Sequence, residues 1–267
     1  MSDQTHAPQS SVEKMTASLK ENREWLDSRL KAERSFDLIR REIRIGGRDA
    51  CLYFIDGFCK DELMQKLLEH FMEIQETDLP ADAGEMAEGF VPYVEVEVKA
   101  DWEEILYSIL SGVSALFVDG YGDCILIDSR TYPARSVEEP EKDKVLRGSK
   151  DGFVETIVFN TALIRRRIRS TDLVMEMMHA GKSSKTDIVI CYMDSRVDRA
   201  FLEKIRDRIK NIRVDALTMN QESLAECLYA RKWYNPFPKF KFTERPDTAA
   251  AQVLEGNIVI LVDNSPS

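Results

Sequence analysis

The run from Arg147 to Arg169 constrains the fold more than any other feature of the sequence. It begins with Arg-Gly-Ser-Lys-Asp-Gly, continues as an amphipathic pattern and ends in a block of arginines. The stretch 136–151 is rich in charge and poor in apolar residues, which is typical of a linker. A chain of 267 residues is long enough for two modest domains. We therefore predict a disordered tail over 1–10, an N-terminal subdomain over 11–135, a linker over 136–151 and a C-terminal subdomain over 152–267.

The predicted N-terminal subdomain is a mixed α+β unit of hairpins and helices. Two runs of β-forming residues flank Gly46-Gly47 and predict a hairpin. Apolar residues spaced by three and four positions predict helices over Lys60–Ile74 and near Trp102–Leu110, and a narrower stripe predicts one or two helices between Ser11 and Arg40. The polar stretch 76–90 predicts a loop. A second strand-turn-strand unit is expected around Asp119–Asp123.

Strands and helices alternate in the predicted C-terminal subdomain. That alternation favours an α/β layer with largely parallel strands, and the whole chain is expected to have a mixed α/β (α+β) fold of two subdomains. Asp194 or Ser195 is the expected N-cap of the helix that ends at Ile212. The other expected elements are helices over Gly152–Arg169, Gln221–Tyr229 and Pro246–Leu254, and strands over Leu173–Met178, Ile188–Tyr192, Val214–Leu217 and Ile258–Val262.

Composition argues against several classes of protein. Acidic residues outnumber basic ones by 47 to 37, so bulk attraction to nucleic acid is not expected. No apolar run reaches the roughly 18–20 residues that span a bilayer, and the polar N-terminus lacks the core of a secretory signal. The five cysteines are dispersed, which predicts free thiols in a reducing compartment and no structural metal. No nucleophile–base pattern or cofactor motif is present, so we expect neither an enzyme nor a bound cofactor.

The arginine block consists of Arg165, Arg166, Arg167 and Arg169. One interpretation is a solvated helix end, where the helix dipole favours cations. The other is an anion or carboxylate clasp, or a contact with another subunit, because guanidinium pairs bidentately with carboxylate. Four arginines within five positions cover more than one face of a helix, so they cannot all serve one small ligand.

The central run resembles the signature region of the GerA-type spore germination proteins, the A subunits of bacterial germinant receptors. The resemblance rests on residues 147–155 and on Asn160 with the following Ala-Leu-Ile-Arg-Arg-Arg-Ile-Arg. The family pattern has proline and arginine or glutamate where this chain has Ser149, Lys150 and Asp151. Further segments agree in order: 182–192, 235–238, 243–247, 254–256, 260–263 and, more loosely, Phe54-Ile55-Asp56-Gly57.

The resemblance implies a non-enzymatic role. Members of this family continue into several transmembrane helices, so we expect this chain to be an aqueous-side domain of a multi-pass protein of the spore inner membrane, cut before the membrane region. The family works with B and C subunits in sensing nutrient germinants, amino acids or sugars, and in coupling sensing to ion release. A homo-oligomer of the full-length protein is also allowed. A paralogous branch acts in spore ion release instead.

Two hypotheses follow for the role of this domain. In the first, ligand or partner binding rearranges the two subdomains about a hinge at Gly148 and Gly152, and the domain binds the germinant itself. In the second, the domain serves assembly and signal transmission and never touches a nutrient. We favour the second, because no linear motif indicates a small-molecule site. The residues predicted to contact a partner or an anion are Arg147, Arg165, Arg166, Arg167, Arg169, Glu244 and Arg245.

Overall fold

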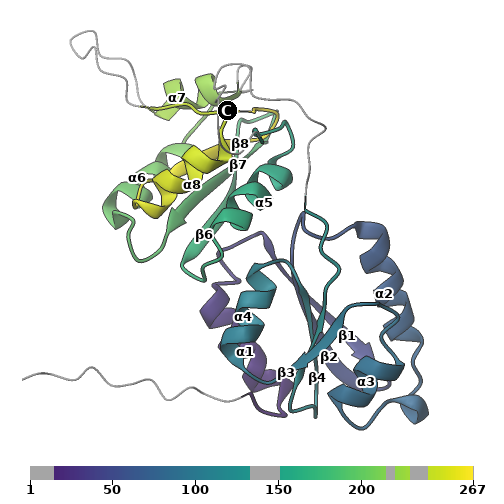
Figure 1. Cartoon of the computed structure of the whole chain (residues 1–267). Coiled ribbons are helices and arrows are strands. Elements are labelled where there is room, and N and C mark those ends of the chain that lie inside the picture. The colour runs from purple at the N-terminus through teal and green to yellow at the C-terminus, as the bar shows by residue number, and fades with distance from the viewer. Residues whose placement is uncertain (1–14, 133–150, 215–219, 229–239, 267) are drawn as a thin grey trace, which may run out of the picture.

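The computed structural model describes residues 15–132, 151–214, 220–228 and 240–266. Two antiparallel sheets organise it, one in the N-terminal half (residues 15–132) and one in the C-terminal half (residues 151–266). Helices cover both faces of each sheet, and the halves lie one above the other (Figure 1). The predicted mixed fold is confirmed. None of the helices in the described residues is long and apolar enough to cross a membrane.

The N-terminal half is built on a five-stranded sheet of order β1-β2-β4-β5-β3. The hairpin around the double glycine is confirmed, and Gly46 and Gly47 adopt positive φ angles of 50° and 78°, which a tight hairpin turn requires. The elements of this half are α1 (Leu19–Leu30), β1 (Leu38–Ile45), β2 (Arg48–Ile55), α2 (Asp61–Glu73), η1 (Glu76–Asp78), α3 (Ala83–Gly89), β3 (Val96–Lys99), α4 (Trp102–Leu110), β4 (Ser114–Val118) and β5 (Cys124–Ile127).

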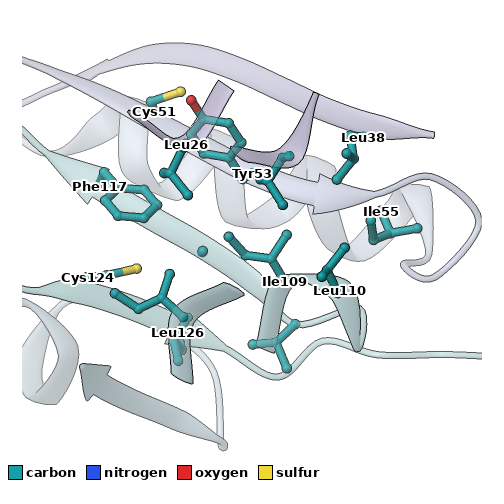
Figure 2. Packing of buried hydrophobic residues seen from close by; sticks show 14 of the residues in the cluster. Leu26, Leu38, Cys51, Tyr53, Ile55, Ile109, Leu110, Phe117, Cys124 and Leu126 are labelled. Atoms are coloured by element: carbon teal, nitrogen blue, oxygen red, sulfur yellow. The ribbon is translucent and has the colours of Figure 1, made fainter. Parts of the chain in front are cut away.

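Strand alternation divides the core of this half into two layers. Neighbouring residues of a strand face opposite sides of the sheet, so Cys51 and Tyr53 pack under α1 and α4, while Ala50 and Leu52 pack under α2 and α3. Figure 2 shows the first layer, where Leu26 of α1 and the C-terminal end of α4 close over the sheet. Since both faces are buried at the centre of the sheet, β4 and β5 are buried along their whole length, whereas β1 and β3 at the edges carry exposed charged residues.

Three elements of this half differ from the sequence prediction. The expected loop over 76–90 contains η1 and α3, because Asp82 accepts a hydrogen bond from the backbone N of Glu85 at 2.9 Å and the helix buries Met86. Strand β3 was not predicted. It extends the edge of the sheet by pairing antiparallel with β5. Its alternation of valine with charged residues is a pattern that indicates a strand.

The C-terminal half contains a three-stranded sheet of order β6-β7-β8. All its strand pairs are antiparallel, so the predicted parallel pairing is wrong. Residues 181–185 alone join β6 to β7, whereas a parallel connection needs about a dozen residues or more. The elements are α5 (Ile157–Arg167), β6 (Leu173–Ala180), β7 (Thr186–Met193), α6 (Arg199–Lys210), α7 (Asn220–Leu228), α8 (Pro246–Leu254) and β8 (Val259–Val262).

Helix boundaries in this half also required correction. Helix α5 begins at Ile157 rather than Gly152; the buried Asn160 side chain bonds the backbone N and O of Val154 at 2.8 and 2.6 Å and holds the preceding segment in an irregular path. Helix α6 begins after Asp198, which caps it, so Asp194 and Ser195 are not the N-cap. The strand expected over Val214–Leu217 lies almost wholly outside the described residues, and Val214 itself is not in a strand.

Candidate functional site

Helix α5 lies between the two halves. Ile157 and Ile164 face the core of the C-terminal sheet, whereas Ala162 belongs to the core cluster of the N-terminal half. On that side α5 meets Gly57, which has a φ angle of 79°. A Cβ atom at Gly57 would lie 3.1 Å from Cγ1 of Val158, so the absence of a side chain there lets the helix approach the turn after β2. We call this contact region the junction.

A buried ion pair lies at the centre of the junction. Arg165 donates from Nε to Oδ2 of Asp37 at 2.7 Å and from Nη2 to Oδ1 at 3.1 Å. Both side chains are buried, with 0% and 1% of their surface exposed. Arg165 also donates to the backbone O of Ser170 at 3.2 Å and of Leu173 at 3.4 Å. A bidentate guanidinium–carboxylate pair fixes both distance and orientation, so it sets how the halves dock.

The segment before β1 also bonds to the outer edge of β6. The backbone N of Phe36 donates to O of Met175 at 3.1 Å, and the backbone N of Met175 donates to Oγ of Ser35 at 3.1 Å. The Phe36 side chain packs against the core of the C-terminal half. The unpaired edge of the small sheet is therefore covered, at this point, by the other half of the chain.

A cluster of charges borders the buried pair. Lys31 Nζ lies 2.9 Å from Oδ1 of Asp172 and 3.2 Å from Oδ2 of Asp194. Arg34 pairs bidentately with Asp194, Nη1 to Oδ1 at 3.0 Å and Nη2 to Oδ2 at 2.8 Å. Arg199, at the start of α6, adds a third cation 2.7 Å from Oδ1 of Asp194. Cations from both halves thus converge on two aspartates of the C-terminal half.

These contacts shift the pKa values of the two aspartates. Hydrogen bonding from Arg34, followed by that from Lys31 and Arg199, holds the pKa of Asp194 well below its ordinary range. Burial alone would raise the pKa of Asp172, but hydrogen bonds from Ser195 and Lys31 outweigh it and lower the pKa. Both carboxylates are consequently charged at neutral pH, and the cluster is a network of ion pairs.

Replacing Asp194 with asparagine is expected to destabilise the chain by about 1–2 kcal/mol at neutral pH. Because the pKa of Asp194 is depressed on folding, its contribution is complete above the unfolded pKa of about 3.9 and disappears as pH falls through the folded pKa. Urea unfolding should therefore show that the difference in free energy of unfolding between the wild type and the variant becomes smaller below a pH of about 4. Asp49→Asn, in an exposed pair with Arg44, should change little. If that difference in free energy stayed constant on acidification, the lowered pKa of Asp194 in the folded chain would be contradicted.

Two of the predicted arginines lie over tyrosines of the N-terminal half. The Arg166 guanidinium carbon is 4.3 Å from the centre of the Tyr132 ring. Arg169 donates from Nη1 to the hydroxyl of Tyr107 at 3.0 Å and from Nη2 to that of Tyr132 at 3.5 Å. Tyr132 is held by its own hydrogen bond to O of Ser111 at 2.9 Å. This side of the junction is an exposed cation–π contact.

The remaining described residues of the predicted contact set lie within the C-terminal half. Arg167 pairs with Asp151, Nη2 to Oδ2 at 2.5 Å, and Arg245 pairs with Asp247, which lies in the first turn of α8. Glu244 accepts a hydrogen bond at its backbone O from N of Phe153 at 2.9 Å. These contacts tie α5, its preceding segment and α8 together. Partner or anion binding by these residues stays a prediction.

The predicted hinge is only partly described. Arg147 and Gly148 lie outside the described residues, whereas Gly152 is buried beside Phe153 at the start of the C-terminal half.

Sequence reasoning missed Asp37, Lys31 and Arg34, which carry no motif. Among the residues that the structure describes, no group of three or more His, Cys, Asp or Glu side chains converges to hold a metal. The junction has the chemistry of a docking contact between the two halves.

Comparison with known proteins gives a consistent family. The model of a family described as Bacillus/Clostridium GerA spore germination protein matches residues 24–267. The chain is 39% identical to Stage V sporulation protein AF of Bacillus subtilis (strain 168) over 247 residues, 92% of this chain and 50% of that protein. It is 27% identical to Spore germination protein KA of the same organism over 236 residues, 87% and 43% of the two chains. This chain therefore spans half or less of the length of these curated relatives.

A solved structure shares the whole architecture. The N-terminal domain of the A subunit of the Bacillus megaterium spore germinant receptor GerK3 superposes with a TM-score of 0.71. The two chains are 29% identical, and the match covers 96% of this chain and 95% of that one. Both halves, and the junction between them, therefore fall within the region of similarity.

Proposed function

The chain belongs to the Bacillus/Clostridium GerA spore germination protein family, and from that premise we propose that it passes a signal between its two halves in the A subunit of a germinant receptor. The observation that carries this proposal is the buried Arg165–Asp37 pair, which couples the halves at a fixed orientation. A displacement of one half is then transmitted to the other instead of being absorbed by a loose connection.

The full-length protein would sit in the spore inner membrane and assemble with B and C subunits to respond to an amino acid or sugar. The similarity to a germinant receptor A subunit supports this part of the proposal. The exposed faces of Arg166 and Arg169, together with Glu244, are the surface that we propose for assembly contacts; Arg245 is buried and pairs with Asp247. The hinge at Gly148 and Gly152 belongs to the other hypothesis, in which the two halves rearrange, and stays a prediction.

A second candidate is a role in spore ion release. The chain is more similar to a stage V sporulation protein, at 39% identity, than to Spore germination protein KA, at 27%. In that case the junction would act in the release step. Ion release would then be slow whatever stimulus triggers germination.

The test uses spores that carry the full-length protein with Arg34→Met, which removes a cation that bridges the halves. Nutrient-triggered loss of spore refractility is expected to slow at unchanged protein abundance. The matched control is Arg23→Met, because Arg23 pairs with Glu42 at 2.8 Å within the N-terminal half, and its spores should germinate normally. Normal germination of both variants would refute transmission through the junction, and slow ion release from Arg34→Met spores after a trigger that bypasses nutrient sensing would favour the second candidate.

A further inference from the structure

A cavity of about 500 Å³ lies in the C-terminal half, apart from the junction. It is bounded by α7, by α8, by the segment that leads into α8 and by β8 (Figure 1 shows these elements at the top of the molecule). Its volume falls within the range of about 300–1,000 Å³ that is usual for small-molecule sites. None of the junction contacts described above lies in its wall.

The cavity follows the free edge of β8. Every residue from Asn257 to Val262 contributes to the wall, although successive side chains of a strand point to opposite faces. Such a wall requires that the cavity run along the strand edge that does not pair with β7. Leu224 and Leu228 of α7 form an apolar side, and the half-exposed rings of Phe201 and Phe242 flank the opening. A ligand here would bury an apolar body.

The charge of the wall is unusual for this chain. Aspartate and glutamate number 47 in the sequence, yet none of the described residues lining the cavity is acidic. Lys241 is the one ionisable side chain among those residues, and it forms no ion pair with any residue that the structure describes. Amide and hydroxyl groups supply the other polar atoms: Gln221, Thr243, Thr248, Gln252 and Asn257. Of the neighbouring stretches of sequence, 229–239 lacks acidic residues and 215–219 contains one, Asp215.

We propose that this cavity binds a small molecule with an apolar body and a single carboxylate, which pairs with Lys241. The apolar wall stabilises the body by removing it from water, and the lysine supplies a charge-assisted hydrogen bond to the head group. A free α-amino acid is selected against, because its ammonium group would enter a wall that offers no carboxylate. This proposal is independent of the role of the junction.

Calorimetric titration of the whole chain with decanoate tests the proposal. Two matched probes accompany it: 2-aminodecanoate adds an ammonium group to the same chain, and 1-decanol removes the charge. We expect decanoate to bind once per chain and at least about tenfold more tightly than either probe. Lys241→Met should weaken decanoate binding about tenfold, and Lys241→Arg should retain it. Lys66→Met, at an exposed position of α2, is the control and should change nothing.

A second variant locates the binding. Ala225→Trp places a large ring in the wall beside Leu224 and should abolish the heat of decanoate binding while the circular dichroism spectrum is unchanged. Three results would each overturn the proposal: no heat with millimolar decanoate, undiminished binding by a folded Ala225→Trp protein, or equal affinity for decanoate and 1-decanol. If Ala225→Trp fails to fold, undiminished binding by Lys241→Met is by itself decisive against the site.

Discussion

Replacing Arg165 with methionine is expected to destabilise the chain by about 3–5 kcal/mol. The variant leaves the Asp37 carboxylate buried, with 1% of its side chain exposed, and without its guanidinium partner. It also removes the donor to the backbone O atoms of Ser170 and Leu173. Desolvating a charge without a partner costs more than the pair itself contributes, so the single variant is much worse than the loss of one ion pair at the surface.

A double-mutant cycle separates the ion pair from other effects of the substitution. Arg165→Met with Asp37→Leu removes both charges, and we expect it to recover about 2–3 kcal/mol relative to the sum of the two single variants. Urea unfolding, with the slope checked for two-state behaviour, measures each corner of the cycle. Additive losses, with no recovery in the double variant, would show that the two side chains do not interact as described.

Phe58→Ala is expected to have an effect of similar size, about 3–5 kcal/mol. The Phe58 side chain is fully buried, and its ring meets that of Tyr132 edge to face at a centroid distance of 5.2 Å. It also fills the space above Gly112, where a Cβ would lie only 2.4 Å from Cδ2 of the ring. Its loss leaves a cavity and removes the support of the tyrosine on which Arg166 stacks.

Thermal unfolding checks this second expectation. The matched control is Phe159→Ala, because 45% of Phe159 is exposed and little apolar surface is lost on its removal. Its melting temperature should stay close to that of the wild type, while Phe58→Ala melts far lower. Equal shifts in the two variants would mean that Phe58 does not support the junction.

Elements with strong local signals could be predicted from the sequence. Helix α4 matches its predicted range, because Asp101 caps it and its apolar residues recur at helical spacing. The β1–β2 hairpin was predictable because the two glycines supply the positive φ angles of its turn. Strand direction in the C-terminal half was predicted wrongly. The alternation of strands and helices suggested crossover connections between parallel strands, whereas the short 181–185 connection allows only an antiparallel hairpin.

The arginine block shows what local patterns leave open. Its spacing indicated that four arginines cover several faces of one helix, and the structure places them in three surroundings: a buried pair with Asp37, the tyrosine surface and a pair with Asp151. The partner of Arg165 is 128 residues away in sequence. A lone aspartate between Phe36 and Leu38 carries no signal of that contact, because tertiary packing alone brings the two together.

The most direct test of the coupled-halves account is the distance between the halves in solution. Spin labels at Lys66→Cys in α2 and Lys204→Cys in α6, with Cys59 and Cys227 changed to alanine, report it by double electron–electron resonance. The account predicts one narrow distance distribution that broadens when Arg165→Met is added under conditions in which that chain stays folded. A wild-type distribution as broad as that of the variant, or a variant as narrow as the wild type, would contradict it.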